Sequence, residues 1–143
     1  MNIRFDVSSL AKPAYQGLYA VSETLAQSSL GAGFKHLVDL RVSQINKCLF
    51  CQNLHVEWGR RDGVGQDRLD AVADWAKSDL FTPDEKAAFA WAEALTAQHE
   101  DKVPALLADL RRHYSDQAIA ELTMIIGVIN AWNRVGISAY DHG

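Results

Sequence analysis

Two cysteines and one histidine are the residues of this sequence whose types and spacing could do chemistry together. Cys48 and Cys51 are the only cysteines among the 143 residues, and His55 follows four residues after the second of them. In a helix of about 3.6 residues per turn, these positions fall on one stripe. His55 is one turn from Cys51 and within its reach, whereas Cys48 is two turns away. The spacing therefore describes a dithiol in which one sulfur has a base beside it.

The two sulfurs would be activated in different ways. Cys48 lies where the helix is expected to begin, and the unpaired N–H groups and dipole of a helix N-terminus favour a thiolate. His55 can instead accept the thiol proton of Cys51. We therefore assign Cys51 as the attacking sulfur and Cys48 as the resolving sulfur, while the helix-end argument alone supports the reverse order.

Two other interpretations fit the same residues. Free cysteine is among the most buried residue types, so the pair could be small core residues beside a buried histidine. Zinc could use Cys48, Cys51 and His55 as ligands, but the sequence has no second cysteine pair to complete a structural zinc site. Thiol redox catalysis is favoured over both, because a lone C-x-x-C in a reducing compartment is typical of a redox-active pair.

Charge and hydropathy narrow the choice of partners and location. The net charge is −4 and the 14 basic residues are scattered, which argues against binding to nucleic acid or to an anionic membrane. No segment reaches the roughly 18 apolar residues of a membrane span, and the N-terminus lacks the apolar run of a signal peptide. We therefore predict a cytoplasmic protein. The sequence has no motif for a flavin, a nicotinamide or a lipoyl partner, so we predict no cofactor.

Helical spacing of apolar residues dominates the chain, and no long alternation of apolar and polar residues predicts a sheet. We expect one all-α domain over residues 1–143, with six to seven helices and a core between about 13 and 137. The expected helices cover residues 13–29, 34–45, 48–60, 66 or 67 to at least 76, 83–98 and 104–113, followed by a strongly apolar helix that begins at 115–116.

Three local signals refine the helix boundaries. Thr82–Glu85 has the pattern of a capping box that opens a helix. Asn46–Lys47 must form a tight turn before the cysteines, where a lysine is less suitable than a glycine if φ is positive. Asn130, Asn133 and Arg134 interrupt the apolar run of the last helix, and from the residues alone we expect the last two to cap and solvate its end.

Residues 41–55, RVSQINKCLFCQNLH, resemble the core motif of the AhpD-like alkylhydroperoxidases, within the carboxymuconolactone decarboxylase superfamily. Ala90–Thr96 and Ile129–Arg134 resemble further segments of its small single-domain members, in the same order and at similar spacing. The resemblance covers about residues 13–137. It implies an all-helical fold, assembly into trimers or hexamers, and a peroxidase-type cycle in which the second cysteine, Cys51, attacks.

The sequence departs from this family pattern at two positions. The family relays protons through a glutamate twelve residues before the first cysteine, and that position is His36 here. A neutral imidazole can still pass a proton, but it does not supply the negative charge that would raise the basicity of His55. We therefore add His36 to the candidate catalytic residues, with a packing or surface role as its alternative. Lys47 replaces the usual glycine before Cys48.

These observations predict a thiol-dependent hydroperoxide reductase or a related thiol-disulfide oxidoreductase. Its partners would be a hydroperoxide or disulfide substrate, a reducing partner that the sequence does not identify, and further copies of the chain. The alternative is a non-enzymatic or zinc-binding oligomer that keeps the fold with degraded activity. His36 in place of the glutamate is the feature that favours this alternative.

Overall fold

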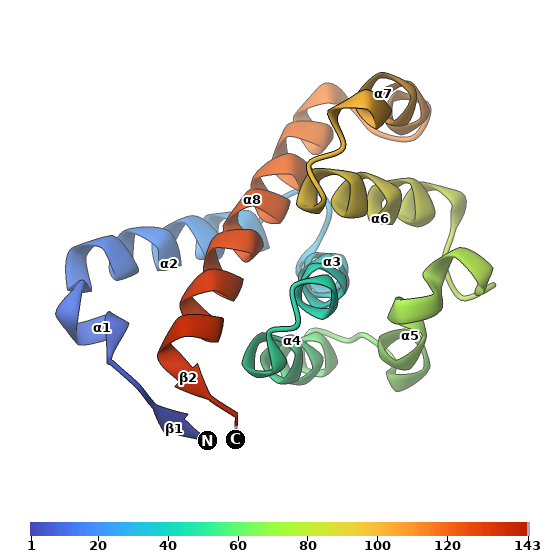
Figure 1. Cartoon of the computed structure of the whole chain (residues 1–143). Coiled ribbons are helices and arrows are strands. Elements are labelled where there is room, and N and C mark those ends of the chain that lie inside the picture. Colours follow the sequence, from blue (N-terminus) through green and yellow to red (C-terminus); the bar gives the residue numbers. More distant parts are fainter. Residues whose placement is uncertain (143) are drawn as a thin grey trace.

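The computed structural model describes residues 1–142, and nearly all of its regular structure is helical (Figure 1). The elements in chain order are β1 (Asn2–Ile3), α1 (Val7–Leu10), α2 (Lys12–Ala26), α3 (Ala32–Ile45), α4 (Leu49–Arg61), α5 (Gln66–Ala71), the 3₁₀ helix η1 (Val72–Lys77), α6 (Pro83–Thr96), the 3₁₀ helix η2 (Glu100–Lys102), α7 (Val103–Arg111), α8 (Asp116–Ala139) and β2 (Tyr140–Asp141). The predicted all-α class is confirmed.

Helix α3 is the centre of the fold. It packs against α4, α6 and α8, which surround it in Figure 1. Six consecutive residues, from Lys35 to Leu40, are buried, so this helix has no solvent-facing side along that stretch. Each aliphatic side chain buried there contributes about 2 kcal/mol to folding. Polar residues on the same stretch, such as Asp39, are therefore drawn into the interior with the apolar ones.

Helix α8 is the longest element and passes across α3. Its most deeply buried apolar side chains follow helical spacing; they are Leu122, Ile125, Ile126 and Ile129. The expectation that Asn133 and Arg134 cap and solvate the end of this helix is wrong, because the helix continues to Ala139. Asn133 is fully buried, donates to Ser43 Oγ at 2.9 Å and accepts from Asn46 Nδ2 at 2.9 Å. These bonds tie α8 to the end of α3.

The local boundary signals are largely confirmed. Thr82 and Glu85 form the capping box of α6. The helix expected from 66 to at least 76 is divided, because α5 ends at Ala71 and a 3₁₀ segment with a kink at Asp74 follows. Lys47 adopts φ = 57°, and the N–H of the next residue reaches back across the turn to the carbonyl of Ser43 at 3.0 Å. The tight turn before the cysteines is therefore a left-handed helix end.

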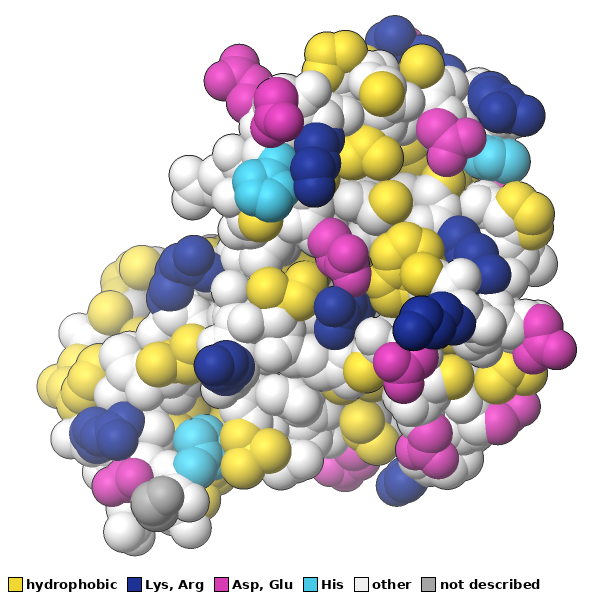
Figure 2. Space-filling model, turned by 45° about the vertical axis from the view of Figure 1, so that its right-hand side comes forward, with side chains coloured by type: hydrophobic (Ala, Val, Ile, Leu, Met, Phe, Trp, Pro, Cys, Tyr) yellow, Lys and Arg dark blue, Asp and Glu magenta, His cyan; other side chains and the backbone are white. Residues whose placement is uncertain are grey.

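The two terminal strands, β1 and β2, lie next to each other (Figure 1). Strands β1 and β2 pair antiparallel, with Asn2 opposite Asp141 and Ile3 opposite Tyr140. The sequence does not predict this small sheet, because two residues per strand are too few to show an alternating pattern. On the face in Figure 2, acidic and basic side chains are intermixed rather than separated by sign. Within residues 1–142, no helix is long and apolar enough to cross a membrane.

Candidate active site

Cys48 and Cys51 lie at the start of α4, as the spacing predicts. Cys48 is the N-cap residue, with an extended backbone, and its Sγ accepts a hydrogen bond from the backbone N–H of Cys51 at 3.3 Å. The two sulfurs are joined in a disulfide. Cys48 is fully buried and Cys51 is 4% exposed. The structure therefore describes the oxidised form of the pair, held at a helix N-terminus.

Helix α8 covers the disulfide at Gly136. A Cβ atom at this position would lie 2.7 Å from Cys48 Sγ and 2.9 Å from Cys51 Sγ, which is closer than atoms of this kind approach. Only a glycine therefore lets the backbone of α8 rest on the two sulfurs. The sequence offers no more than a glycine inside a helical pattern as a signal for this contact.

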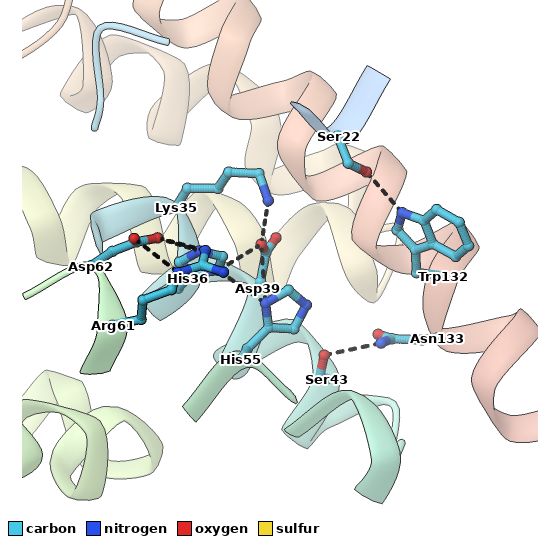
Figure 3. A network of polar contacts seen from close by, with 10 residues as sticks. All are labelled: Ser22, Lys35, His36, Asp39, Ser43, His55, Arg61, Asp62, Trp132 and Asn133. Carbon is cyan, nitrogen blue, oxygen red and sulfur yellow. Dashed lines mark hydrogen bonds and ion pairs between the residues drawn. The ribbon is translucent and has the colours of Figure 1, made fainter. Parts of the chain in front are cut away.

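His55 lies on α4 one turn beyond Cys51, and His36 on α3 lies directly behind it (Figure 3). The two Nδ1 atoms are 3.1 Å apart, and His36 Nε2 is 2.9 Å from Asp62 Oδ2. Both imidazoles are buried. The surface alternative for His36 is therefore wrong: the structure places this residue in contact with the predicted base.

The protonation of the two imidazoles follows from their burial. Burial lowers the pKa of His55 to about 4, and it also lowers the pKa of His36. Both rings are therefore neutral near neutral pH. Asp62, the partner of His36 on the side away from His55, accepts a hydrogen bond from Arg61. This bond lowers the pKa of Asp62, so its side chain is a carboxylate under the same conditions.

Lys35 and Asp39 form a buried ion pair that is not among the candidate residues predicted from the sequence. Lys35 Nζ is 2.7 Å from Asp39 Oδ2, and the same oxygen lies 3.5 Å from His55 Nδ1 and 3.8 Å from His36 Nδ1. Asp39 thus provides a negative charge beside His55, which His36 does not supply in place of the family's glutamate. The available signal was its place one turn after Lys35, the spacing of an ion pair within a helix.

Among the described residues, three groups come close enough to one another to suggest a metal site. One nitrogen each of His36 and His55 and one carboxylate oxygen of Asp39 lie within 4.8 Å of one another. The ammonium group of Lys35 already neutralises the carboxylate and would repel a second cation. We therefore assign no metal to this cluster. The predicted zinc alternative through Cys48 and Cys51 requires the reduced dithiol, because disulfide sulfurs are not thiolate ligands.

A cavity of about 260 Å³ adjoins the disulfide. Cys51 and His55 line it together with Lys35 and Asp39, whereas Cys48 does not. The rest of its wall is largely aromatic and aliphatic and includes Tyr15, Tyr19, Phe50, Leu54, Trp58, Ile125, Ile129, Trp132 and Tyr140. The indole of Trp132 is fixed by a hydrogen bond from Nε1 to Ser22 Oγ at 2.8 Å (Figure 3). The cavity therefore offers an apolar organic molecule access to one sulfur beside a base.

A mostly helical fold with a cysteine pair at the start of a helix defines a class of proteins. Comparison with known proteins identifies the family. The sequence model of the carboxymuconolactone decarboxylase family matches residues 13–94, which include Cys48, Cys51 and His55. The chain therefore belongs to this family.

Three similar proteins accompany this match. The chain is 31% identical over 139 residues to the uncharacterized protein YdfG of Bacillus subtilis (strain 168), covering 96% of this chain and 95% of YdfG. It is 36% identical over 105 residues to the uncharacterized protein YnjA of Escherichia coli (strain K12), covering 73% of this chain and 57% of YnjA. The solved structure of ATU0492 from Agrobacterium tumefaciens has a TM-score of 0.90 and 32% identity, with 99% of each chain covered. ATU0492 is a protein of unknown function that has been suggested to be the antioxidant defence protein AhpD.

Proposed function

We propose that this protein reduces organic hydroperoxides with its dithiol, with Cys51 attacking and Cys48 resolving. One observation carries the proposal: of the two sulfurs joined in the disulfide, only that of Cys51 lines the apolar cavity, and His55 lines the same cavity one turn away. Cys48 is enclosed behind it. The family membership and the suggested role of ATU0492 support the same assignment.

The proposed cycle begins with the reduced dithiol. His55 takes the thiol proton of Cys51, and the thiolate attacks the terminal oxygen of the hydroperoxide and breaks the O–O bond. The leaving alkoxide takes a proton from His55 and departs as an alcohol, which leaves Cys51 as a sulfenic acid. The thiol of Cys48 then attacks the Cys51 sulfur, forms the disulfide and releases water. A thiol or dithiol reductant returns the pair to the reduced state and is itself oxidised to a disulfide.

Cys48 has the surroundings of a resolving thiol. It is the N-cap of α4, where the free N–H groups of the first turn stabilise negative charge on sulfur. Gly136 allows α8 to lie against it, so its sulfur cannot move away from Cys51 in that direction. A sulfenic acid on Cys51 would therefore find its partner already in place.

The remaining partners in the proposal follow from the chemistry. The substrate is a hydroperoxide or, for the related exchange reaction, a disulfide. The reducing compartment of the cytoplasm suits an enzyme whose dithiol must be regenerated after every turnover. Assembly into a trimer or hexamer of identical chains is the arrangement that the family resemblance implies.

The test is a count of free thiols. Reduced protein is treated with cumene hydroperoxide, alkylated with iodoacetamide and weighed by mass spectrometry. We expect both alkylation sites to be lost in the native sequence and Cys51→Ser to abolish the reaction. In Cys48→Ser, Cys51 should stop at the sulfenic acid, which dimedone traps. If both thiols stay free in excess hydroperoxide, the proposal is wrong.

The same reduced sample also tests the alternative of a zinc-binding protein. Metal analysis after purification without chelators should find much less than one zinc per chain. One zinc per chain, lost in the Cys51→Ser variant, would support the alternative in place of the peroxidase. The two functions can be distinguished because they need the same sulfurs, and a sulfur that is bound to zinc cannot at the same time form the disulfide.

A further inference from the structure

We propose that Asp62 is a positioning residue that acts through His36 to hold the proton of His55 on Nδ1, and so leaves Nε2 as the base toward the cavity. The inference concerns the base of the proposed dithiol reaction, and in that respect it rests on the proposed function. The position of the proton itself can be measured without any reaction.

Asp62, His36 and His55 form one chain of contacts (Figure 3), from the partly exposed Asp62 to His55, which lines the cavity. Asp62 follows directly after α4 and its side chain is 24% exposed. Its Oδ2 is 2.9 Å from His36 Nε2, and His36 Nδ1 is 3.1 Å from His55 Nδ1. His36 is thus the only link that joins the carboxylate of Asp62 to His55 in this series of contacts.

The contacts determine where each proton lies. An ionised carboxylate can only accept, so the proton between Asp62 and His36 belongs to His36 Nε2. A neutral imidazole carries one N–H, which leaves a lone pair on His36 Nδ1. The bond between the two rings therefore uses the Nδ1–H of His55 as donor. The remaining lone pair of His55 is on Nε2, at the far edge of the ring from His36.

The neighbouring groups agree with this assignment. The charged groups around the two rings and their partners are Lys35 and Asp39 on α3, and Arg61 and Asp62 at the end of α4. Trp58 packs against both imidazoles in T-shaped contacts. Asp39 is held by Lys35 at 2.7 Å and lies farther from the imidazoles than they lie from each other. Since Asp39 can also only accept, it favours the same proton position on His55.

The proposed role of Asp62 adds no reactant and no product to the reaction. When the thiol proton of Cys51 moves to His55 Nε2, the ring becomes a cation with N–H groups on both sides. The Nδ1–H then donates toward His36, whose own Nε2–H donates to the negative Asp62, so the positive charge is stabilised along the chain. The proton returns from Nε2 to the leaving alkoxide.

Long-range ¹H–¹⁵N NMR of the oxidised protein reads the proton position directly. We expect the native protein to show His55 protonated at Nδ1, and Asp62→Asn to move its two nitrogen shifts toward each other as the second form becomes populated. Asp62→Glu should restore the native pattern. The matched control is Asp109→Asn, which removes a carboxylate near a different histidine, His113, and should leave His55 unchanged.

A second measurement is the rate at which the Cys51 thiol is alkylated. In the reduced Cys48→Ser protein, we expect Asp62→Asn to slow alkylation of Cys51 at neutral pH by about tenfold or more, because the base then carries a proton on Nε2 for part of the time. The rate should recover at high pH, where the base is no longer needed, and Asp62→Glu should recover it at neutral pH.

Three results would overturn the inference. One is a native His55 protonated at Nε2, and another is an Asp62→Asn protein with unchanged nitrogen shifts. The third is a stoichiometric response of both imidazoles to added zinc, which would make the cluster a metal site. None of these results depends on hydroperoxide, so failure of the inference about Asp62 is distinct from failure of the proposed function. Conversely, an inert dithiol with the expected shifts would leave the proton assignment intact.

Discussion

Gly136 shows how a single hydrogen in place of a methyl group can determine whether a redox pair fits. The backbone of α8 approaches the disulfide so closely that a Cβ would lie within 3 Å of both sulfurs. The disulfide cannot move away easily, because Cys48 is the N-cap of α4 and is enclosed on its other sides. The site therefore depends on a residue that carries no chemistry of its own.

We expect Gly136→Ala to destabilise the oxidised protein by about 1 to 3 kcal/mol, the usual cost of overpacking a buried site. The matched control is Gly127→Ala on the same helix, where an added Cβ meets nothing within 4 Å. There the helix propensity of alanine should make the change neutral or stabilising by up to about 1 kcal/mol. Urea unfolding of the oxidised proteins measures both changes. Equal effects at the two glycines would contradict the close contact.

At the scale of elements, the junction between α3 and α4 has a non-glycine residue in a left-handed backbone conformation. Lys47 has φ = 57° and Gln98, after α6, has φ = 58°. Each residue follows a helix end and adopts the left-handed conformation that ordinarily favours glycine. The turn is nevertheless required, because it brings Cys48 to the start of α4 directly after α3 ends.

Lys47→Gly should therefore raise the free energy of unfolding by about 1 kcal/mol, since a left-handed conformation costs a residue with a Cβ that much. Gln98→Gly is the matched variant, with the same backbone conformation at a distance from the dithiol, and should give a similar gain. Thermal denaturation provides the comparison. A lower Tm for both variants would show that the left-handed turns carry no such cost.

Helices were the part of this fold that sequence patterns could predict, because apolar spacing and caps are local. Thr82 and Glu85 mark the start of α6 from their own types alone. Asn133 could not be placed in this way: its burial depends on α8 crossing the end of α3, where Ser43 and Asn46 meet it.

The candidate site was predictable to the same extent. Cys48, Cys51 and His55 follow one another on a single helix, so their spacing was sufficient. Asp39 and Asp62 reach the site from another helix and from a helix end, and charged residues of this kind usually face solvent. Their roles appear only after α4 has packed on α3. The sequence gives the reacting groups, whereas the tertiary packing supplies the charges around them.

For the whole molecule, burial of His55 links folding to pH. The unfolded chain binds a proton on this residue below its ordinary pKa of 6.5, whereas the folded chain binds it only below about 4. Its contribution to stability is therefore fully present above 6.5 and is lost as the pH falls through about 4. The lowered pKa of His36 acts in the same direction.

We expect the free energy of unfolding of the oxidised protein to fall by on the order of 3 kcal/mol from His55 alone between near-neutral pH and about pH 4. Urea unfolding at several pH values measures the slope. His55→Gln should show a shallower dependence, because the group that gains a proton on unfolding is gone. Parallel curves for the two proteins would contradict the burial of a neutral imidazole.

The enclosure of Cys48 under α8 has a consequence for the order of events in the proposed cycle. Only the Cys51 sulfur lines the cavity, so an oxidant and a reductant must reach the same atom through the same space. In the proposed cycle the two reagents would then exclude each other, and the protein would alternate between an oxidised and a reduced form without ever holding both. Excess of either reagent would slow the step that needs the other, so turnover would depend on the ratio of the two as well as on their amounts.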